Sequence, residues 1–208
     1  MSKFPRKINI RKPHTVIKIF TEGINTEPKY FNSIRDELRM SEIDIVVWGL
    51  GDHTLPLVES VLKMKQEEGS DEDVATEWWV VFDRDDHEHF DKSIKLAIDN
   101  GINVAYSNEC FELWFILHFE FLNTAIGRRQ YEKKLSELLG KKYNKKSSFD
   151  VYELVKDKEQ VAIKNAKRLE KDFNDQGVSS YIKRDPSTLV YKLVERLRSL
   201  KDEKNKLW

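Results

Sequence analysis

The first 125 residues alternate between short apolar runs and helical patterns. Four runs are apolar nearly throughout and are bounded by turn residues, which is typical of strands buried in a sheet. They lie at residues 16–20, 43–48, 78–82 and 102–106. Between them, apolar residues recur at the three- and four-residue spacing of helices, at residues 28–38, 55–64 and 90–98. This alternation predicts an α/β domain with a parallel sheet of about four strands, flanked by helices.

The pattern changes after the fourth run. Residues 111–121 are apolar nearly all round, which predicts a buried helix. Surface-type helical patterns follow at residues 151–172 and 187–200, and a short strand is predicted at 178–182.

A division of charge accompanies this change. The chain carries 36 Lys and Arg and 36 Asp and Glu, so its formal net charge is +0. Residues 1–127 hold 14 basic and 23 acidic side chains, a balance of −9, whereas residues 128–208 hold 22 and 13, a balance of +9. An acidic part suits a metal ion and a basic part suits phosphate, although long charged helices can also carry such a bias. We expect an α/β domain over residues 13–125 and a mainly helical, basic C-terminal region over 126–208 that packs on it.

Composition excludes several classes of protein. Hydrophobic residues make up 39% of the chain, which is enough for a core and excludes wholesale disorder. No apolar run approaches the ~20 residues of a membrane span, and the N-terminus lacks the apolar stretch of a signal peptide. Cys110 is the single cysteine, so a disulfide framework and a cysteine-rich zinc site are excluded. A cytoplasmic protein is expected.

Acidic residues follow three of the predicted strands. Glu22 and Glu27 come after the first strand, Asp83 and Asp85 after the third, and Glu112 after the fourth. Ligands of such sheets bind outside the carboxyl ends of the strands, and the two carboxylates of an Asp-x-Asp point in roughly the same direction. Carboxylate oxygens suit Mg²⁺ and Mn²⁺, which also bind substrate phosphates. The sequence therefore predicts a site for one of these ions at this edge of the sheet.

Structural alternatives stand beside this interpretation. Glu27 would complement the positive end of a helix dipole, and Glu112 would be a buried acid bonded to backbone amides. His118, in an apolar helix, is expected to be a core histidine, and Cys110 a core residue. His87 lies in a polar loop and is expected to be solvated.

Several segments resemble the RloB family. The most specific is the run Ser107-Asn108-Glu109-Cys110-Phe111-Glu112-Leu113-Trp114, and further matching segments lie at residues 20–31, 81–87, 118–119 and, more weakly, 186–191. RloB-like proteins are regarded as members of the Toprim group, which includes topoisomerases, primases and overcoming-lysogenization-defect nucleases. The resemblance implies a Toprim-like (Rossmann-like) fold.

The resemblance also implies roles for individual acids. Glu22 matches the Toprim glutamate, Asp83 and Asp85 match its aspartate pair, and Glu27 falls where the related nucleases place a second acid. Asp86-His87 stands where the group usually continues as Asp-x-Asp-x-Glu or Asp-Gly-Asp, so this chain departs from the pattern there.

The acids at the sheet edge, together with the resemblance, predict a Mg²⁺- or Mn²⁺-dependent nuclease. The resemblance further implies an anti-phage defence system, because genes of this family lie near restriction-modification and abortive-infection loci. The predicted catalytic residues are Glu22, Asp83, Asp85 and Glu112, and the predicted metal ligands are Glu22, Glu27, Asp83 and Asp85. The side chains expected to contact nucleic-acid phosphates are Arg128, Arg129, Lys141, Lys142, Lys145, Lys146, Lys183 and Arg184.

The resemblance implies an ATPase partner, because genes of this family often lie beside one. Two alternatives to a nuclease remain open. One is a catalytically silent, metal-binding sensor or effector subunit of an ATPase complex, and the other is a nucleotidyltransferase of the primase type. The choice among DNA, RNA and tRNA as substrate, and a homo-oligomeric state, also remain open.

Overall fold

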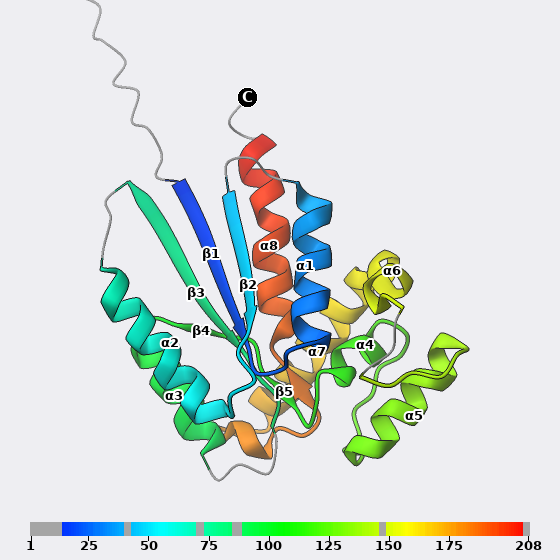
Figure 1. Cartoon of the computed structure of the whole chain (residues 1–208). Helices are drawn as coiled ribbons and strands as arrows, with labels where there is room; N and C mark the ends of the chain where they lie inside the picture. Colours follow the sequence, from blue (N-terminus) through cyan, green and yellow to red (C-terminus); the bar gives the residue numbers. More distant parts are fainter. Residues whose placement is uncertain (1–13, 40–42, 70–72, 85–88, 146–148, 206–208) are drawn as a thin grey trace, which may run out of the picture.

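A four-stranded parallel sheet forms the centre of the molecule (Figure 1). The computed structural model describes residues 14–39, 43–69, 73–84, 89–145 and 149–205. The strands pair in the order β2-β1-β3-β4, and every pair is parallel. Their bounds are β1 His14–Thr21, β2 Ile43–Gly49, β3 Val74–Val81 and β4 Asn103–Val104. The predicted α/β fold with a parallel sheet is confirmed.

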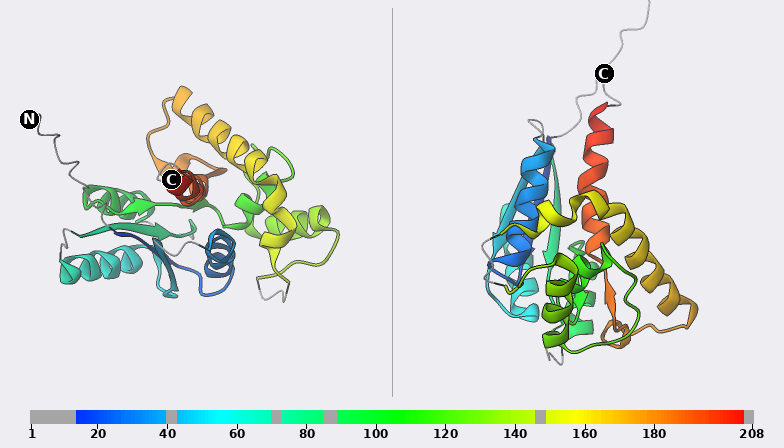
Figure 2. Two further views of the ribbon diagram at one scale, coloured as in Figure 1. Left: turned by 90° about the horizontal axis from the view of Figure 1, so that it is seen from above. Right: turned by 90° about the vertical axis from the view of Figure 1, so that its right-hand side faces the viewer.

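Helices cover both faces of this sheet (Figures 1 and 2). The side chains of β1 alternate between the faces, so that Ile19 is buried on one side while Lys18 pairs with Glu68 of α2 on the other. On the Ile19 side, Glu77 of β3 accepts hydrogen bonds from Arg196 of α8, at 2.6 and 2.8 Å. The helices concerned are α1 Thr26–Leu38, α2 Thr54–Glu68, α3 Phe90–Asp99 and α8 Val190–Asn205. The C-terminal helix thus completes a face of the sheet beside α1.

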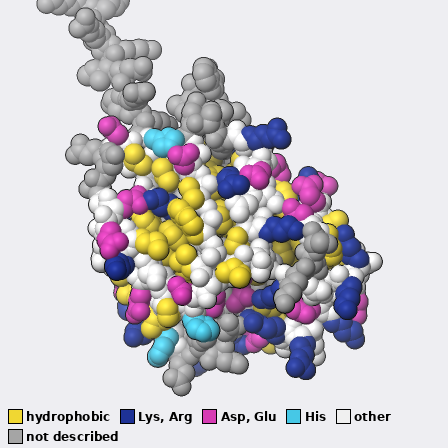
Figure 3. Space-filling model, in the orientation of Figure 1, with side chains coloured by type: hydrophobic (Ala, Val, Ile, Leu, Met, Phe, Trp, Pro, Cys, Tyr) yellow, Lys and Arg dark blue, Asp and Glu magenta, His cyan; other side chains and the backbone are white. Residues whose placement is uncertain are grey.

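A small antiparallel ladder joins the segment after β4 to the segment before α8. Strand β5 (Ser107–Asn108) pairs with β6 (Ser187–Thr188), and the hydroxyls of Ser107 and Thr188 are 2.9 Å apart. The remaining helices are α4 Glu112–Leu117, α5 Arg128–Leu139, α6 Val151–Val155, η1 Lys156–Lys158, α7 Glu159–Asp175 and η2 Tyr181–Lys183. Figure 3 shows Lys and Arg side chains gathered towards the side of the molecule that carries α5.

Several predicted elements are shorter or different in the structure. Only residues 103–104 of the predicted strand 102–106 pair with β3, and the predicted helix 151–172 is broken by the 3₁₀ turn η1. The strand predicted at 178–182 is wrong. Its backbone groups bond to side chains instead: Asp91 accepts from the Ile182 N–H, and the Asn108 amide donates to nearby carbonyls.

The core is continuous between the two predicted regions. Buried side chains from β1, α4, α7 and α8 belong to one hydrophobic cluster. The division at residues 13–125 and 126–208 stays a prediction. Within the described ranges, no helix is both long and apolar enough to cross a membrane.

Candidate functional site

The acids that follow β1 and β3 lie at the same edge of the sheet. The backbone N–H of Glu22 donates to Val81 O at 2.9 Å, so the chain after β1 stays beside the end of β3. The Glu22 carboxylate Oε2 in turn accepts from the backbone N–H of Asp83, at 3.1 Å. Asp83 also forms a parallel bridge with Ser107, which brings the segment after β4 to this edge.

Three buried carboxylates gather there. The exposed fractions of Glu27, Asp83 and Glu112 are 4%, 5% and 0%. Burial raises the pKa of Asp83 well above its ordinary range, and the charges of Glu27 and Glu112 raise it further. Burial likewise raises the pKa of Glu27. Among the described residues, Asp83 Oδ1 and Glu112 Oε2 have no hydrogen-bond partner.

Gly23 makes room for one of these carboxylates. A Cβ atom on Gly23 would stand 2.6 Å from Cδ of Glu27, closer than any real contact. The carboxylate of Glu27 therefore lies against the bare backbone of the β1–α1 connection, which only glycine leaves open.

Two cations from the basic region face the acids. Arg128 Nη2 and Lys145 Nζ each lie 3.7 Å from Asp83 Oδ2. Burial alone would lower the pKa of Lys145, but the negative charges of Glu112, Asp83 and Glu27 outweigh it and raise that pKa. A third group from the same part of the chain, the Tyr143 hydroxyl, donates to Glu112 Oε1 at 2.8 Å.

The chemistry of this donor set fits a hard divalent cation. Buried carboxylate oxygens without hydrogen-bond partners, gathered around an Asp83 whose pKa is raised, are stabilised by a positive ion. Over the ranges that the structure describes, however, no group of three or more Asp, Glu, His or Cys side chains stands ready to hold a metal. Asp85, a predicted ligand, lies outside the described residues, as do Asp86, His87 and Lys146.

Comparison with known proteins now gives the family. The family model described as RloB-like protein matches residues 17–197, which is most of the chain. The chain belongs to the RloB-like family. No curated protein and no solved structure matches it.

Residues 107–114, the run that most closely resembles the family, include some residues that hold the fold and one that contributes to the acid cluster. The Asn108 side-chain amide donates to the carbonyls of Tyr181 and Arg184, at 3.1 and 2.8 Å, and so holds the loop before β6. Glu109 has a φ of 38°, in the left-handed region, and its side chain pairs with Arg84. Glu112, four residues after Asn108, enters the acid cluster.

Other predicted phosphate-binding residues of the RloB-like chain lie in varied surroundings. Arg129, Lys142 and Lys183 are exposed, and Lys141 lies over the ring of Phe149 with its Nζ 4.0 Å from the centroid. Arg184 already donates to Val178 O through Nε and Nη2, at 2.9 and 2.6 Å, and so ties down its own loop. The nucleic-acid role of all these residues stays a prediction.

The structural interpretations of the core residues hold. His118 is buried, its Nδ1 lies 2.9 Å from Trp114 O, and burial lowers its pKa to about 4. Burial raises the pKa of Cys110 well above its ordinary value, so this core cysteine is a neutral thiol. The sequence analysis did not identify Tyr143 as a site residue. The one feature that could have indicated it is that it is a single aromatic residue within a lysine-rich segment.

Proposed function

We propose that this RloB-like protein is a metal-dependent nuclease of an anti-phage defence system that acts with an ATPase partner. The observation that supports this best is the convergence of Glu27, Asp83 and Glu112 from three segments, with two buried oxygens left without partners. Such a cluster favours a bound cation, because burial and the charges of Glu27 and Glu112 raise the pKa of Asp83.

The acids and the cations have complementary roles in this proposal. Glu22, Glu27, Asp83 and Asp85 would hold Mg²⁺ or Mn²⁺, and Glu112 would complete the site or orient water. When bound, the ion supplies an activated water and neutralises charge on the phosphate oxygens. Arg128 and Lys145, which contact Asp83 in the structure, are placed to contact a phosphate brought to this edge.

A silent sensor is the second candidate. It is favoured by the ion pairs of Arg128 and Lys145 with Asp83, since these already neutralise part of the acid cluster without a metal. In that case the site would bind an ion and signal to the ATPase without cutting nucleic acid.

The experiment compares three forms of the full chain. Wild type, Asp83→Asn and the control Asp44→Asn are incubated with end-labelled DNA and RNA, with Mg²⁺, Mn²⁺ or chelator, and with and without the proposed ATPase partner. Asp44 is an exposed acid on β2 that pairs with His14, outside the acid cluster. We expect cleavage by wild type and Asp44→Asn in metal, and none by Asp83→Asn or in chelator.

Metal binding, measured by titration calorimetry, separates the candidates. An ion that binds wild type but not Asp83→Asn, without cleavage under any condition, supports the sensor. Cleavage by Asp83→Asn at the wild-type rate contradicts the proposed site itself.

A further inference from the structure

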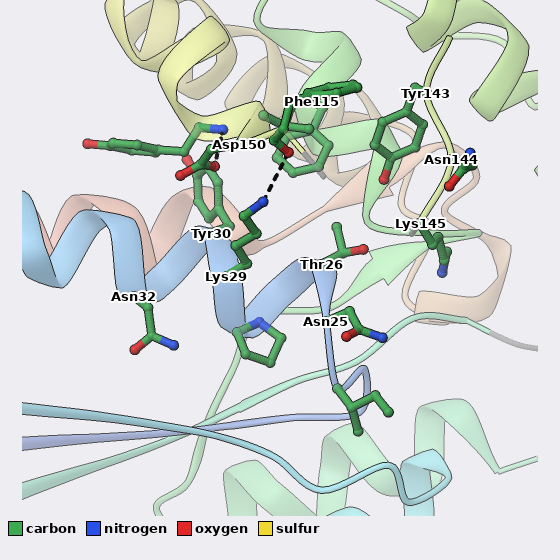
Figure 4. Close-up of a pocket in the computed structure, with 15 residues that line it drawn as sticks. Asn25, Thr26, Lys29, Tyr30, Asn32, Phe115, Tyr143, Asn144, Lys145 and Asp150 are labelled. Atoms are coloured by element: carbon green, nitrogen blue, oxygen red, sulfur yellow. Dashed lines mark hydrogen bonds between the residues drawn. The ribbon is translucent and has the colours of Figure 1, made fainter. Parts of the chain in front are cut away.

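A pocket of about 450 Å³ adjoins the acid cluster (Figure 4). It lies between the start of α1, the start of α6 and the segment around Tyr143, so it joins the α/β part to the basic region. Two of its lining residues contact the acid cluster: Lys145 Nζ lies 3.7 Å from Asp83 Oδ2, and the Tyr143 hydroxyl donates to Glu112. A ligand in the pocket is therefore next to the place where a phosphate would be cut.

The pocket walls combine aromatic rings with side chains that can donate and accept hydrogen bonds. Phe149 and Tyr143 supply aromatic surface, Asn25 and Asn144 supply amides that both donate and accept, and Thr26 supplies a hydroxyl. Figure 4 shows Thr26, Tyr143 and Lys145 around one end of the pocket. Amides beside aromatic rings are the groups that recognise unstacked bases in single-stranded nucleic acids.

Asn25 is the most informative of these side chains. It occupies the N-cap position of α1, where asparagine usually accepts a hydrogen bond from the backbone of the first turn. Here its side chain makes no such bond, and it is exposed at the pocket. A good capping residue that does not cap leaves its amide available to a ligand.

Lysine side chains lie around the same pocket, whose lining also holds the carboxylate of Asp150. Lys29 lines it and donates to Phe149 O at 3.0 Å, and Lys141 lies over the Phe149 ring. Together with Lys145, these side chains favour a ligand that carries phosphate. The volume falls in the ~300–1,000 Å³ range of small-ligand pockets, which suits one nucleotide and not a duplex.

Building on the proposed nuclease function, we infer that this pocket binds the base of one unpaired nucleotide of the substrate, next to the substrate phosphate that would lie at Asp83. The substrate is therefore single-stranded, or locally unpaired, nucleic acid. A base inside a duplex is stacked and paired, and it enters such a pocket only after it is flipped out of the helix.

Binding without metal tests this inference independently of cleavage. Fluorescence anisotropy in chelator gives the affinity of the full wild-type chain for short single-stranded DNA, single-stranded RNA, the two duplexes and a nucleoside monophosphate. We expect a single strand to bind about tenfold or more tightly than its duplex, the range given by stacking of one base. The DNA and RNA arms identify which sugar the site prefers.

Asn25→Ala is the diagnostic variant, and Asn174→Ala is its control. Asn174 is an exposed asparagine near the end of α7, outside the pocket. Asn25→Ala should weaken single-strand binding about two- to tenfold, as for one lost hydrogen bond, and leave duplex binding and the melting temperature unchanged. Asn174→Ala should change none of these quantities.

Three results would overturn the inference: equal affinity for single strands and duplexes, wild-type binding by Asn25→Ala, or a monophosphate that binds as tightly as the strand. The last result would indicate a free-nucleotide site. If the protein binds single strands more tightly than duplexes, and Asn25→Ala weakens that binding, but no nucleic acid is cleaved, the base-binding pocket is supported and only the proposed nuclease activity is contradicted.

Discussion

Asp83→Asn should stabilise the metal-free protein at neutral pH. Burial, together with the charges of Glu27 and Glu112, raises the pKa of Asp83 in the folded state above its value of 3.8 in a free chain. The folded protein therefore binds more protons than the unfolded chain between those two pKa values, and stability falls as the pH rises through that interval. Above it, the cost is about 1.4 kcal/mol for each pH unit that separates the two values. Removing the charge should therefore raise the free energy of unfolding by about 1–3 kcal/mol.

Lys145 limits this gain. Its Nζ lies 3.7 Å from Asp83 Oδ2, and two unit charges about 4 Å apart attract by about 4 kcal/mol near a protein surface, before desolvation and side-chain entropy. The Lys145 side chain is 39% exposed, so solvent screens the pair and we expect a net coupling of about 1–2 kcal/mol. Asp83→Asn should thus stabilise the Lys145→Met variant by that much more than it stabilises wild type.

Urea unfolding in chelator, followed by tryptophan fluorescence, measures all four members of this double-mutant cycle. The gain from Asp83→Asn should shrink as the pH falls from about 8 towards 4, because the folded state then takes up its proton on Asp83 and the charge is no longer buried. Asp44→Asn, at an exposed acid, is the control and should show no such change. Loss of stability in Asp83→Asn at pH about 8, or a gain independent of pH, would refute the electrostatic reasoning and indicate a structural anchor.

Three further variants test other parts of the structure. Gly23→Ala should abolish cleavage in the nuclease assay because its Cβ displaces the neighbouring carboxylate, while Gly127→Ala, which meets nothing within 4 Å, should keep activity. Glutamate at both Lys141 and Lys142 should weaken nucleic-acid binding in the anisotropy assay and flatten its salt dependence by about 0.7–0.9 per lost phosphate contact; an unchanged slope would exclude them from the substrate path. Asn108→Ala should lower the free energy of unfolding by about 1–3 kcal/mol in urea, because the loop carbonyls that its amide binds lose their partner.

The sequence predicted the central part of the fold because burial leaves a local signature. The runs at 16–20 and 78–82 are apolar on both faces except at Lys18, and both lie in strands with a neighbour on each side. The run at 102–106 looks the same, but its strand β4 lies at the edge of the sheet and pairs on one side only, with β3. Its backbone keeps the same register beyond β4, since the N–H groups of Ala105 and Ser107 donate to the carbonyls of Val80 and Phe82, at 2.9 and 3.0 Å.

The segment at 178–182 shows what a local pattern cannot reveal. A short strand is predicted here, yet side chains distant in sequence bind its backbone. Asp91 accepts a hydrogen bond from the Ile182 N–H, and the Asn108 amide donates to the Tyr181 carbonyl. Nothing in the five residues themselves indicates these partners, because tertiary contacts outweigh strand propensity here.

The part of the site that could be predicted is the part whose position follows from the order and direction of the strands. Parallel strands end at one edge, so Glu22 and Asp83 had to be neighbours once both strands were recognised. The position of Lys145 depends instead on how a connection between α5 and α6 packs against α1, for which the sequence offers no periodic signal. The lysines of this connection predicted contact with phosphate, but the sequence did not indicate which lysine faces the acids.

The opposite charges of the two halves of the chain meet at Asp83. Acids from residues 1–127 bury their carboxylates there, and Arg128 and Lys145 from the basic half lie 3.7 Å from one of its oxygens. Without these cations, the repulsion among the buried acids would destabilise the protein further. A divalent ion at Asp83 would replace them, and cations released from the carboxylate would then remain beside the site to pair with phosphate oxygens. Under the proposed function, metal and substrate should therefore each increase the affinity for the other. The metal ion would neutralise Asp83, and the substrate phosphate would neutralise the Arg128 and Lys145 side chains that the metal displaces.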